Sequence, residues 1–212
     1  QISSVARDLE WRMTAFLRNT EIMGVASCGS QPVGMAVDVG TTKIAASLLD
    51  LETGEELAVT GALNPQISYG EDVISRLAYV LRVSEGGHSL AALVRETLNN
   101  LLAELTERAG VSRDQVAEVC LVGNTAMTHL FLELPVSQLS RSPYVAATDA
   151  ALTIKARDAG LTTAPGAYLY VLPCIRGFIG ADHVAMILAA QLDHTDSAAV
   201  GIDIGTNTEI VL

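Results

Sequence analysis

Two short segments of the sequence carry the residue types that hold phosphates and divalent cations. The first is Val37-Asp38-Val39-Gly40-Thr41-Thr42, and the same pattern returns near the end as Ile202-Asp203-Ile204-Gly205-Thr206-Asn207. Glycine lets backbone N–H groups approach an anion without an intervening Cβ, and threonine hydroxyls add further donors. An aspartate can hold Mg²⁺, usually through waters. The repeat therefore predicts two halves of one site for a phosphate chain and its metal ion.

The elements around the two segments are expected to be β-hairpins. Apolar strands are predicted over residues 34–38 and 199–204, and each leads through a glycine turn into a second strand, over 43–51 or 209–212. A single Asp-x-Gly-Thr could equally be a tight turn whose aspartate bonds its own backbone. Two copies on matching hairpins favour a shared function.

The rest of the chain is predicted to form a mixed sheet flanked by helices. Further strands are expected over residues 57–63, 116–122 and 168–172. Helices are expected over residues 71–83, 89–109, 125–132 and 181–192. The first helix would bury one face formed by Val73, Ile74, Leu77, Val80 and Leu81. A three-stranded meander followed by helix–strand alternation is typical of the α/β class.

The first 32 residues differ in pattern from the rest of the chain. Polar and apolar residues alternate over 11–27, which predicts a short hairpin. The turn-rich segment 28–32 then marks a boundary. No secretory signal is visible at the start and no apolar run is long enough to cross a bilayer.

Composition narrows the function classes. The net charge is −11, with 24 acidic against 13 basic residues, and such a surface repels nucleic-acid backbones and anionic membranes. The three cysteines, Cys28, Cys120 and Cys174, are far apart and form no cluster-binding pattern. We therefore expect a reducing cytosol and no iron–sulfur centre within this chain.

Other polar residues have two interpretations each. Lys43 could reach a phosphate or be a solvated edge-strand lysine. Glu209 could position water or join a metal shell, or be an ordinary strand-face residue. His129 and His183 have no second ligand at i+4, so packed or surface histidines are favoured over metal ligands.

Helix starts have the same ambiguity. Asp72, Asn124 and Asp182 are expected either to cap helices or to face a ligand. The polar run from residue 64 to 72 is costly to order without a use, which favours a place at a cleft or partner surface.

These residues carry a resemblance to a known superfamily. The two hairpins resemble the phosphate-1 and phosphate-2 motifs of the acetate kinase, sugar kinase, heat-shock chaperone and actin superfamily. The closer resemblance is to the ATP-dependent reductive activators of corrinoid proteins. It is carried by residues 34–43, 62–76, 123–130, 172–182 and 201–212, and most specifically by Asn64-Pro65-Gln66-Ile67-Ser68-Tyr69-Gly70-Glu71-Asp72-Val73-Ile74-Ser75-Arg76.

The resemblance implies a fold and a domain organisation. The fold would be a ribonuclease-H-like half of an actin-like ATPase domain. Residues 1–32 would be the tail of a preceding middle domain plus a linker, 33–198 the first lobe, and 199–212 the start of a second lobe. Family members carry a ferredoxin-like domain with a [2Fe-2S] cluster, which lies outside this chain.

The resemblance also implies a function. ATP would drive reduction of cob(II)amide to cob(I)amide on a partner corrinoid protein in the cytoplasm, with homodimer formation left open. Asp38 and Asp203 would organise Mg²⁺ and the attacking water, assisted by Glu209. The phosphates would be held by Gly40, Thr41, Thr42, Lys43, Gly205, Thr206 and Asn207. The chain alone is not expected to turn over ATP, because the adenosine-binding part is missing.

Two other functions fit the same motifs. A small-molecule kinase would release ADP faster when its acceptor is present. A non-enzymatic, nucleotide-gated scaffold would bind a partner according to nucleotide state, without electron transfer.

Overall fold

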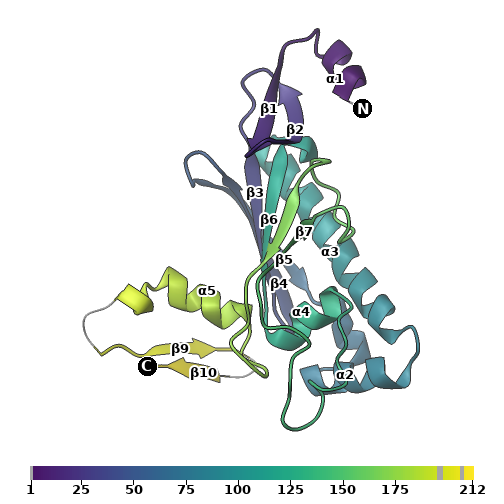
Figure 1. Ribbon diagram of the computed structural model, residues 1–212, viewed down its shortest axis with the longest axis vertical. Helices are drawn as coiled ribbons and strands as arrows, with labels where there is room; N and C mark the ends of the chain where they lie inside the picture. The colour runs from purple at the N-terminus through teal and green to yellow at the C-terminus, as the bar shows by residue number, and fades with distance from the viewer. Residues whose placement is uncertain (1, 195–197, 206–207) are drawn as a thin grey trace.

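A six-stranded mixed sheet is the centre of the molecule (Figure 1). The computed structural model describes residues 2–194, 198–205 and 208–212. The strands lie in the order β5-β4-β3-β6-β8-β7. Their bounds are β3 Val33–Val39, β4 Lys43–Asp50, β5 Glu56–Leu63, β6 Val116–Val122, β7 Leu152–Lys155 and β8 Tyr168–Val171. The predicted mixed sheet is confirmed, whereas β7 was not predicted from the sequence.

The pairing follows the order in which the strands are made. β3, β4 and β5 form an antiparallel meander, and β6 and β8 join β3 in parallel. β7 pairs antiparallel with β8 at the edge. The carboxyl ends of the three parallel strands therefore meet at one end of the sheet, where loops most often carry function.

Alternation along β3 separates a core face from an open face. Val33, Met35, Val37 and Val39 are buried, whereas Ala36 and Asp38 lie on the exposed side. Because side chains alternate along a strand, the apolar set fixes the direction in which Asp38 points.

Helices cover the core face. α2 (Val73–Arg82), α3 (Gly86–Ala109) and α4 (Thr125–Phe131) lie to one side of the sheet in Figure 1. The helix predicted over residues 89–109 is confirmed as part of α3, and its buried face consists mainly of leucines: Leu90, Leu98, Leu101, Leu102 and Leu105. Gly110 ends this helix in the left-handed conformation, with φ of 67°.

The predicted face of α2 is partly wrong. Val73 and Leu77 are buried, but Ile74 and Leu81 are about half exposed. Arg76 takes the inward position in their place and is completely buried.

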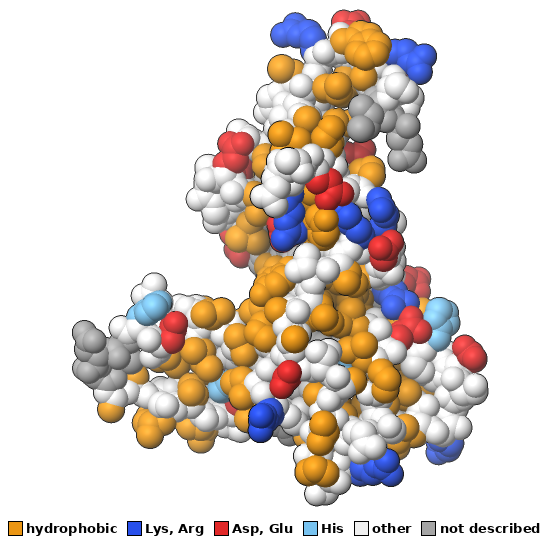
Figure 2. Space-filling view, in the orientation of Figure 1, with side chains coloured by type: hydrophobic (Ala, Val, Ile, Leu, Met, Phe, Trp, Pro, Cys, Tyr) orange, Lys and Arg blue, Asp and Glu red, His pale blue; other side chains and the backbone are white. Residues whose placement is uncertain are grey.

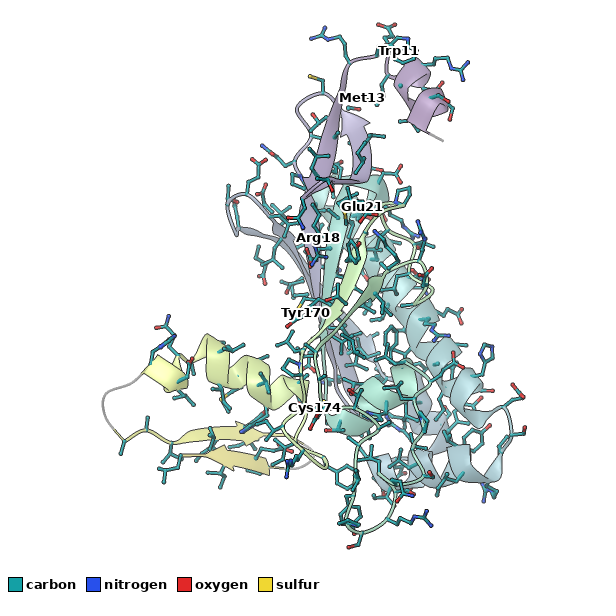
Figure 3. All side chains as sticks on the ribbon, in the orientation of Figure 1. Trp11, Met13, Arg18, Glu21, Tyr170 and Cys174 are labelled. Carbon is teal, nitrogen blue, oxygen red and sulfur yellow. The ribbon has the colours of Figure 1, made fainter. Side chains whose placement is uncertain are left out.

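The N-terminal segment forms a separate small unit. α1 (Ile2–Asp8) was not predicted, while the hairpin of β1 (Met13–Arg18) and β2 (Glu21–Ser27) was. Arg18 and Glu21 lie where this hairpin meets the large sheet (Figure 3). The Tyr168 hydroxyl donates to Glu21 at 2.7 Å, and Lys155 Nζ pairs with the same carboxylate at 2.5 Å.

The C-terminal elements project from the other side of the sheet (Figure 1). They are α5 (Ala181–Ala189), shorter than predicted, a 3-10 turn at Leu192–His194, and the hairpin of β9 (Gly201–Ile204) and β10 (Thr208–Val211). Apolar side chains are conspicuous on this hairpin in Figure 2, and Ile202, Ile204 and Ile210 are all more than half exposed.

Two further observations concern the whole described chain. Across the described ranges, no helix combines the length and apolar character that a membrane span requires. Cys28, Cys120 and Cys174 are free thiols.

Candidate functional site

The first glycine turn joins β3 to β4 at the functional end of the sheet. A Cβ on Gly40 would come within 2.6 Å of the Lys43 carbonyl oxygen, so the turn accepts only glycine there without moving. Thr41 is buried, whereas Thr42 and Lys43 are exposed. The turn therefore presents an open surface while its middle residue anchors it.

A buried polar network holds this turn from the inside. Asn64 Nδ2 donates to the Gly40 carbonyl at 2.8 Å, and Arg76 donates to the Thr41 carbonyl at 2.6 Å. Asn124 Nδ2 donates to the Thr41 hydroxyl at 3.0 Å. None of these side chains was assigned to the turn from the sequence. The sequence feature that could have revealed Arg76 is a charged residue three positions after Val73, on the face of α2 that also carries Leu77.

The starts of α4 and α5 are packed against each other beside the turn. Ala181 N–H donates to the Gly123 carbonyl at 2.9 Å. A Cβ on Gly123 would come within 2.7 Å of the Val39 carbonyl oxygen, and one on Gly180 would overlap the backbone of Gly123 and Asn124. Glycine at both positions thus brings two helix starts and the end of β3 together.

The expected caps have clear outcomes. Asp72 caps α2 by accepting from Ser75 N–H at 2.7 Å, and Asn124 caps α4 by accepting from Met127 N–H at 3.0 Å. Asp182 lies in the first turn of α5, whose cap residue Gly180 has no side chain to bond. The capping interpretation is confirmed for Asn124, which also bonds the Thr41 hydroxyl, while its ligand interpretation stays a prediction.

Four carboxylates from separate elements gather at this end of the molecule: Asp38, Asp182, Asp203 and Glu209. Desolvation raises the pKa of Asp38 to about 6, helped by the negative charges of Asp182 and Asp203. Desolvation also raises the pKa of Asp182 and that of Glu209, and in each case Asp203 adds to the increase. The carboxylates of the two repeated hairpins therefore lie within electrostatic reach of each other.

This acidic group suits a hydrated Mg²⁺ ion. Mg²⁺ prefers oxygen ligands and commonly keeps several waters while one or two carboxylates bind it. No three metal-ligating side chains within the described residues are close enough to enclose an ion. Desolvation is the main cause of the raised pKa values, and repulsion among the carboxylates adds to it. A divalent cation relieves that repulsion, so the donor set fits Mg²⁺ bound largely through water.

The remaining predicted site residues lie on the two hairpins. Glu209 is half-buried on β10, Gly205 comes directly after β9, and Lys43 is exposed at the start of β4. Thr206 and Asn207 lie outside the described residues. The structure thus brings Asp38, Asp203 and Glu209 into one electrostatic group, and the phosphate-binding roles of the turn residues stay predictions.

His129 is packed in the interior, which is one of the two favoured interpretations. Its Nδ1 lies 2.7 Å from the Thr125 carbonyl and its Nε2 accepts from Ala147 N–H at 3.0 Å, so Nδ1 carries the proton. Desolvation lowers the pKa of His129.

Two buried polar atoms near the joined helix starts have no partner in the part of the chain that is described. They are Thr125 Oγ1, at the first position of α4, and His183 Nδ1, at the third position of α5. Buried polar groups are nearly always satisfied in the working state of a protein. Their presence agrees with a polar ligand or water at this end of the sheet.

Comparison with known proteins defines the class first. Residues 33–195 match the family model described as the RACo middle region. The match covers most of the chain, so the chain belongs to this family.

Two particular relatives are informative. The chain is 33% identical over 179 residues to the corrinoid activation enzyme RamQ of Eubacterium limosum, covering 84% of this chain and 30% of that protein. A solved structure titled "Reductive activator for corrinoid, iron-sulfur protein" superposes with a TM-score of 0.85 at 32% identity, covering 93% of this chain and 32% of the other. This chain thus spans about a third of each relative.

Proposed function

We propose that this chain is the phosphate-binding part of an ATP-dependent reductive activator, which reduces cob(II)amide to cob(I)amide on a corrinoid protein. The observation that carries the proposal is that Asp38 of the first glycine-turn hairpin lies near enough to Asp203 of the second for the Asp203 charge to help raise the Asp38 pKa, beside desolvation and Asp182. The names of both relatives, corrinoid activation enzyme and reductive activator, support the choice of reaction.

The fold we propose is the ribonuclease-H-like first lobe of an actin-like ATPase. An antiparallel meander joined in parallel by two further strands supports it. The exposed apolar side chains of β9 and β10 support our division at residue 199, with the hairpin beginning a second lobe. We likewise propose that residues 1–32 end a preceding domain.

Each site residue has a proposed task. Asp38 and Asp203 would hold Mg²⁺, and Glu209 would orient a water beside them. Gly40, Thr41, Thr42 and Lys43 hold phosphates on one side, and Gly205, Thr206 and Asn207 on the other. Mg·ATP, when bound, would supply the free energy of phosphoryl transfer. Its charges would also draw the two hairpins together.

The electron is proposed to come from a [2Fe-2S] cluster in another part of the whole protein. That cluster, when reduced, would supply the one electron that converts Co(II) of the corrinoid substrate to Co(I). The chain's task is to link the nucleotide state to the distance between donor and acceptor. Free thiols at all three cysteines support a cytoplasmic setting.

The test is Mg·ATP-dependent reduction of a cob(II)amide-bearing protein by the full-length activator under anaerobic conditions. We expect the cob(I) absorption spectrum to form with the unmutated protein and with the surface control Asp158→Ala, and to be lost with Asp38→Ala. ATP hydrolysis with no cobalt change across corrinoid partners would contradict the proposal. Acceptor-dependent ADP release would then favour the kinase, and nucleotide-dependent association alone the scaffold.

A further inference from the structure

Arg76 is the feature of the site that the proposed function leaves unexplained. Among the described residues it is the only lysine, arginine, aspartate or glutamate that is buried, and none of its surface is exposed. Its guanidinium donates to the carbonyls of Gly70 at 2.9 Å and Thr41 at 2.6 Å, and to Gln66 Oε1 at 3.3 Å. Every one of these acceptors is neutral.

The charge of Arg76 has no buried counter-ion. In the described part of the chain no carboxylate forms an ion pair with it. Desolvation lowers the pKa of Arg76, and Asp72, whose carboxylate is exposed and caps α2, opposes this. A guanidinium nevertheless stays protonated in proteins. A lone buried cation is costly unless it serves a partner.

The contact with Thr41 sets the direction of the turn. In a planar trans peptide the N–H points opposite to the preceding carbonyl. The Gly40 carbonyl is bound by Asn64 and the Thr41 carbonyl by Arg76, both from the interior. The N–H groups of Thr41 and Thr42 are therefore directed away from the interior.

The same side chain ties the turn to the helices around it. Arg76 lies on α2, contacts Met127 Sδ of α4 at 3.3 Å, and shares Gln66 with the Leu90 carbonyl of α3 through a 3.0 Å bond. One guanidinium thus links the turn to the three helices of the core face.

We propose that Arg76 is the positioning residue of the phosphate site, which fixes the Gly40–Thr42 turn through the Thr41 carbonyl and lends its buried positive charge to the phosphates. The inference rests on the proposed function, because the anion is the phosphate chain of ATP. If Arg76 were purely structural, its loss would weaken the binding of every ligand alike.

The test compares two variants of the full-length protein with a matched control. Arg76→Gln removes both the positive charge and the planar guanidinium with its several donors. Arg76→Lys keeps the charge and removes only the guanidinium geometry. Arg82→Gln changes an exposed arginine on the same helix. Dissociation constants for Mg·ATP and adenosine are measured by calorimetry. We expect Arg76→Gln to weaken Mg·ATP by about tenfold or more while adenosine changes by less than about twofold, as for loss of a charge-assisted contact. Arg76→Lys should be intermediate, and Arg82→Gln unchanged.

Equal losses for Mg·ATP and adenosine, or an unchanged Mg·ATP constant in a folded Arg76→Gln protein, would overturn the proposal. If the variants do not fold, the Arg76 side-chain ¹⁵N signal of the unmutated protein should shift on adding Mg·ATP but not adenosine. Absence of that shift would also overturn it.

A failure of the proposed function can be distinguished from a failure of the positioning role of Arg76. If the unmutated protein does not bind Mg·ATP, the proposed function fails. The state of the turn is then measured by hydrogen exchange of the Asn64 backbone N–H, which donates to the Thr42 carbonyl at 2.9 Å. Its hydrogen exchange should accelerate in Arg76→Lys and not in Arg82→Gln. An unchanged rate would refute the positioning role.

Discussion

At the scale of single residues, the site contains carboxylates whose ionisation is disfavoured by the folded structure. Asp38 lies near the end of an apolar strand, where desolvation and then the charges of two other aspartates oppose its ionisation. Groups whose placement lowers the stability of the folded protein are common where a ligand is bound. The type and spacing of Asp38 and Asp203 were visible in the sequence. Arg76 and Asn64 were not assigned, because which polar side chain bonds a turn depends on tertiary contacts.

The pH dependence of stability should report Asp38 directly. Its pKa of about 6 in the folded chain exceeds the ordinary 3.8, so the folded state binds the proton first. The Asp38 contribution therefore makes the free energy of unfolding fall as pH rises from about 4 to about 6, after which it is level. Asp38→Asn should be more stable than the unmutated chain at pH 7 without metal, as judged by urea unfolding. A less stable Asp38→Asn at pH 7 would contradict this account.

At the scale of elements, close packing of glycines decides where the helices start. The sequence predicted the strands, α3 and the two hairpins well, because their apolar periodicity is long and regular. It missed β7, which is four residues long, and it misassigned the faces of Ile74 and Leu81. In a short helix beside a polar network, the bonding of Arg76 decides which face turns inward.

Gly180→Ala tests the contact between α4 and α5. The added Cβ would overlap the backbone of Gly123 and Asn124, so we expect a loss of about 1–3 kcal/mol in the free energy of unfolding. Gly87→Ala is the matched control, because its Cβ would meet only Val80 at 3.7 Å. That substitution, at the second residue of α3, should change the free energy of unfolding by no more than about 0.5 kcal/mol. Urea unfolding of both variants is the measurement, and equal behaviour would refute the packing argument.

At the scale of the whole molecule, the large sheet lies between the N-terminal hairpin and the acidic group. Glu21 of the N-terminal hairpin is held by Lys155 and Tyr168 at one end, and the acidic group lies at the other. β6 and β8 run between these ends. The class of fold could be inferred from the order of strands and helices, and the repeat predicted that the two hairpins share one site. That Asp182 of α5 joins their carboxylates required the three-dimensional structure.

The central claim is that the two repeated hairpins form one Mg·ATP site, and a double-mutant cycle tests it most directly. Calorimetry would give the Mg·ATP dissociation constant of the full-length protein, of Asp38→Asn, of Asp203→Asn and of the double variant. We predict that each single change weakens binding by about tenfold or more and that the double variant is little worse than either, because residues sharing a partner are not additive. Independent, fully additive losses, or no loss from Asp203→Asn, would contradict a shared site.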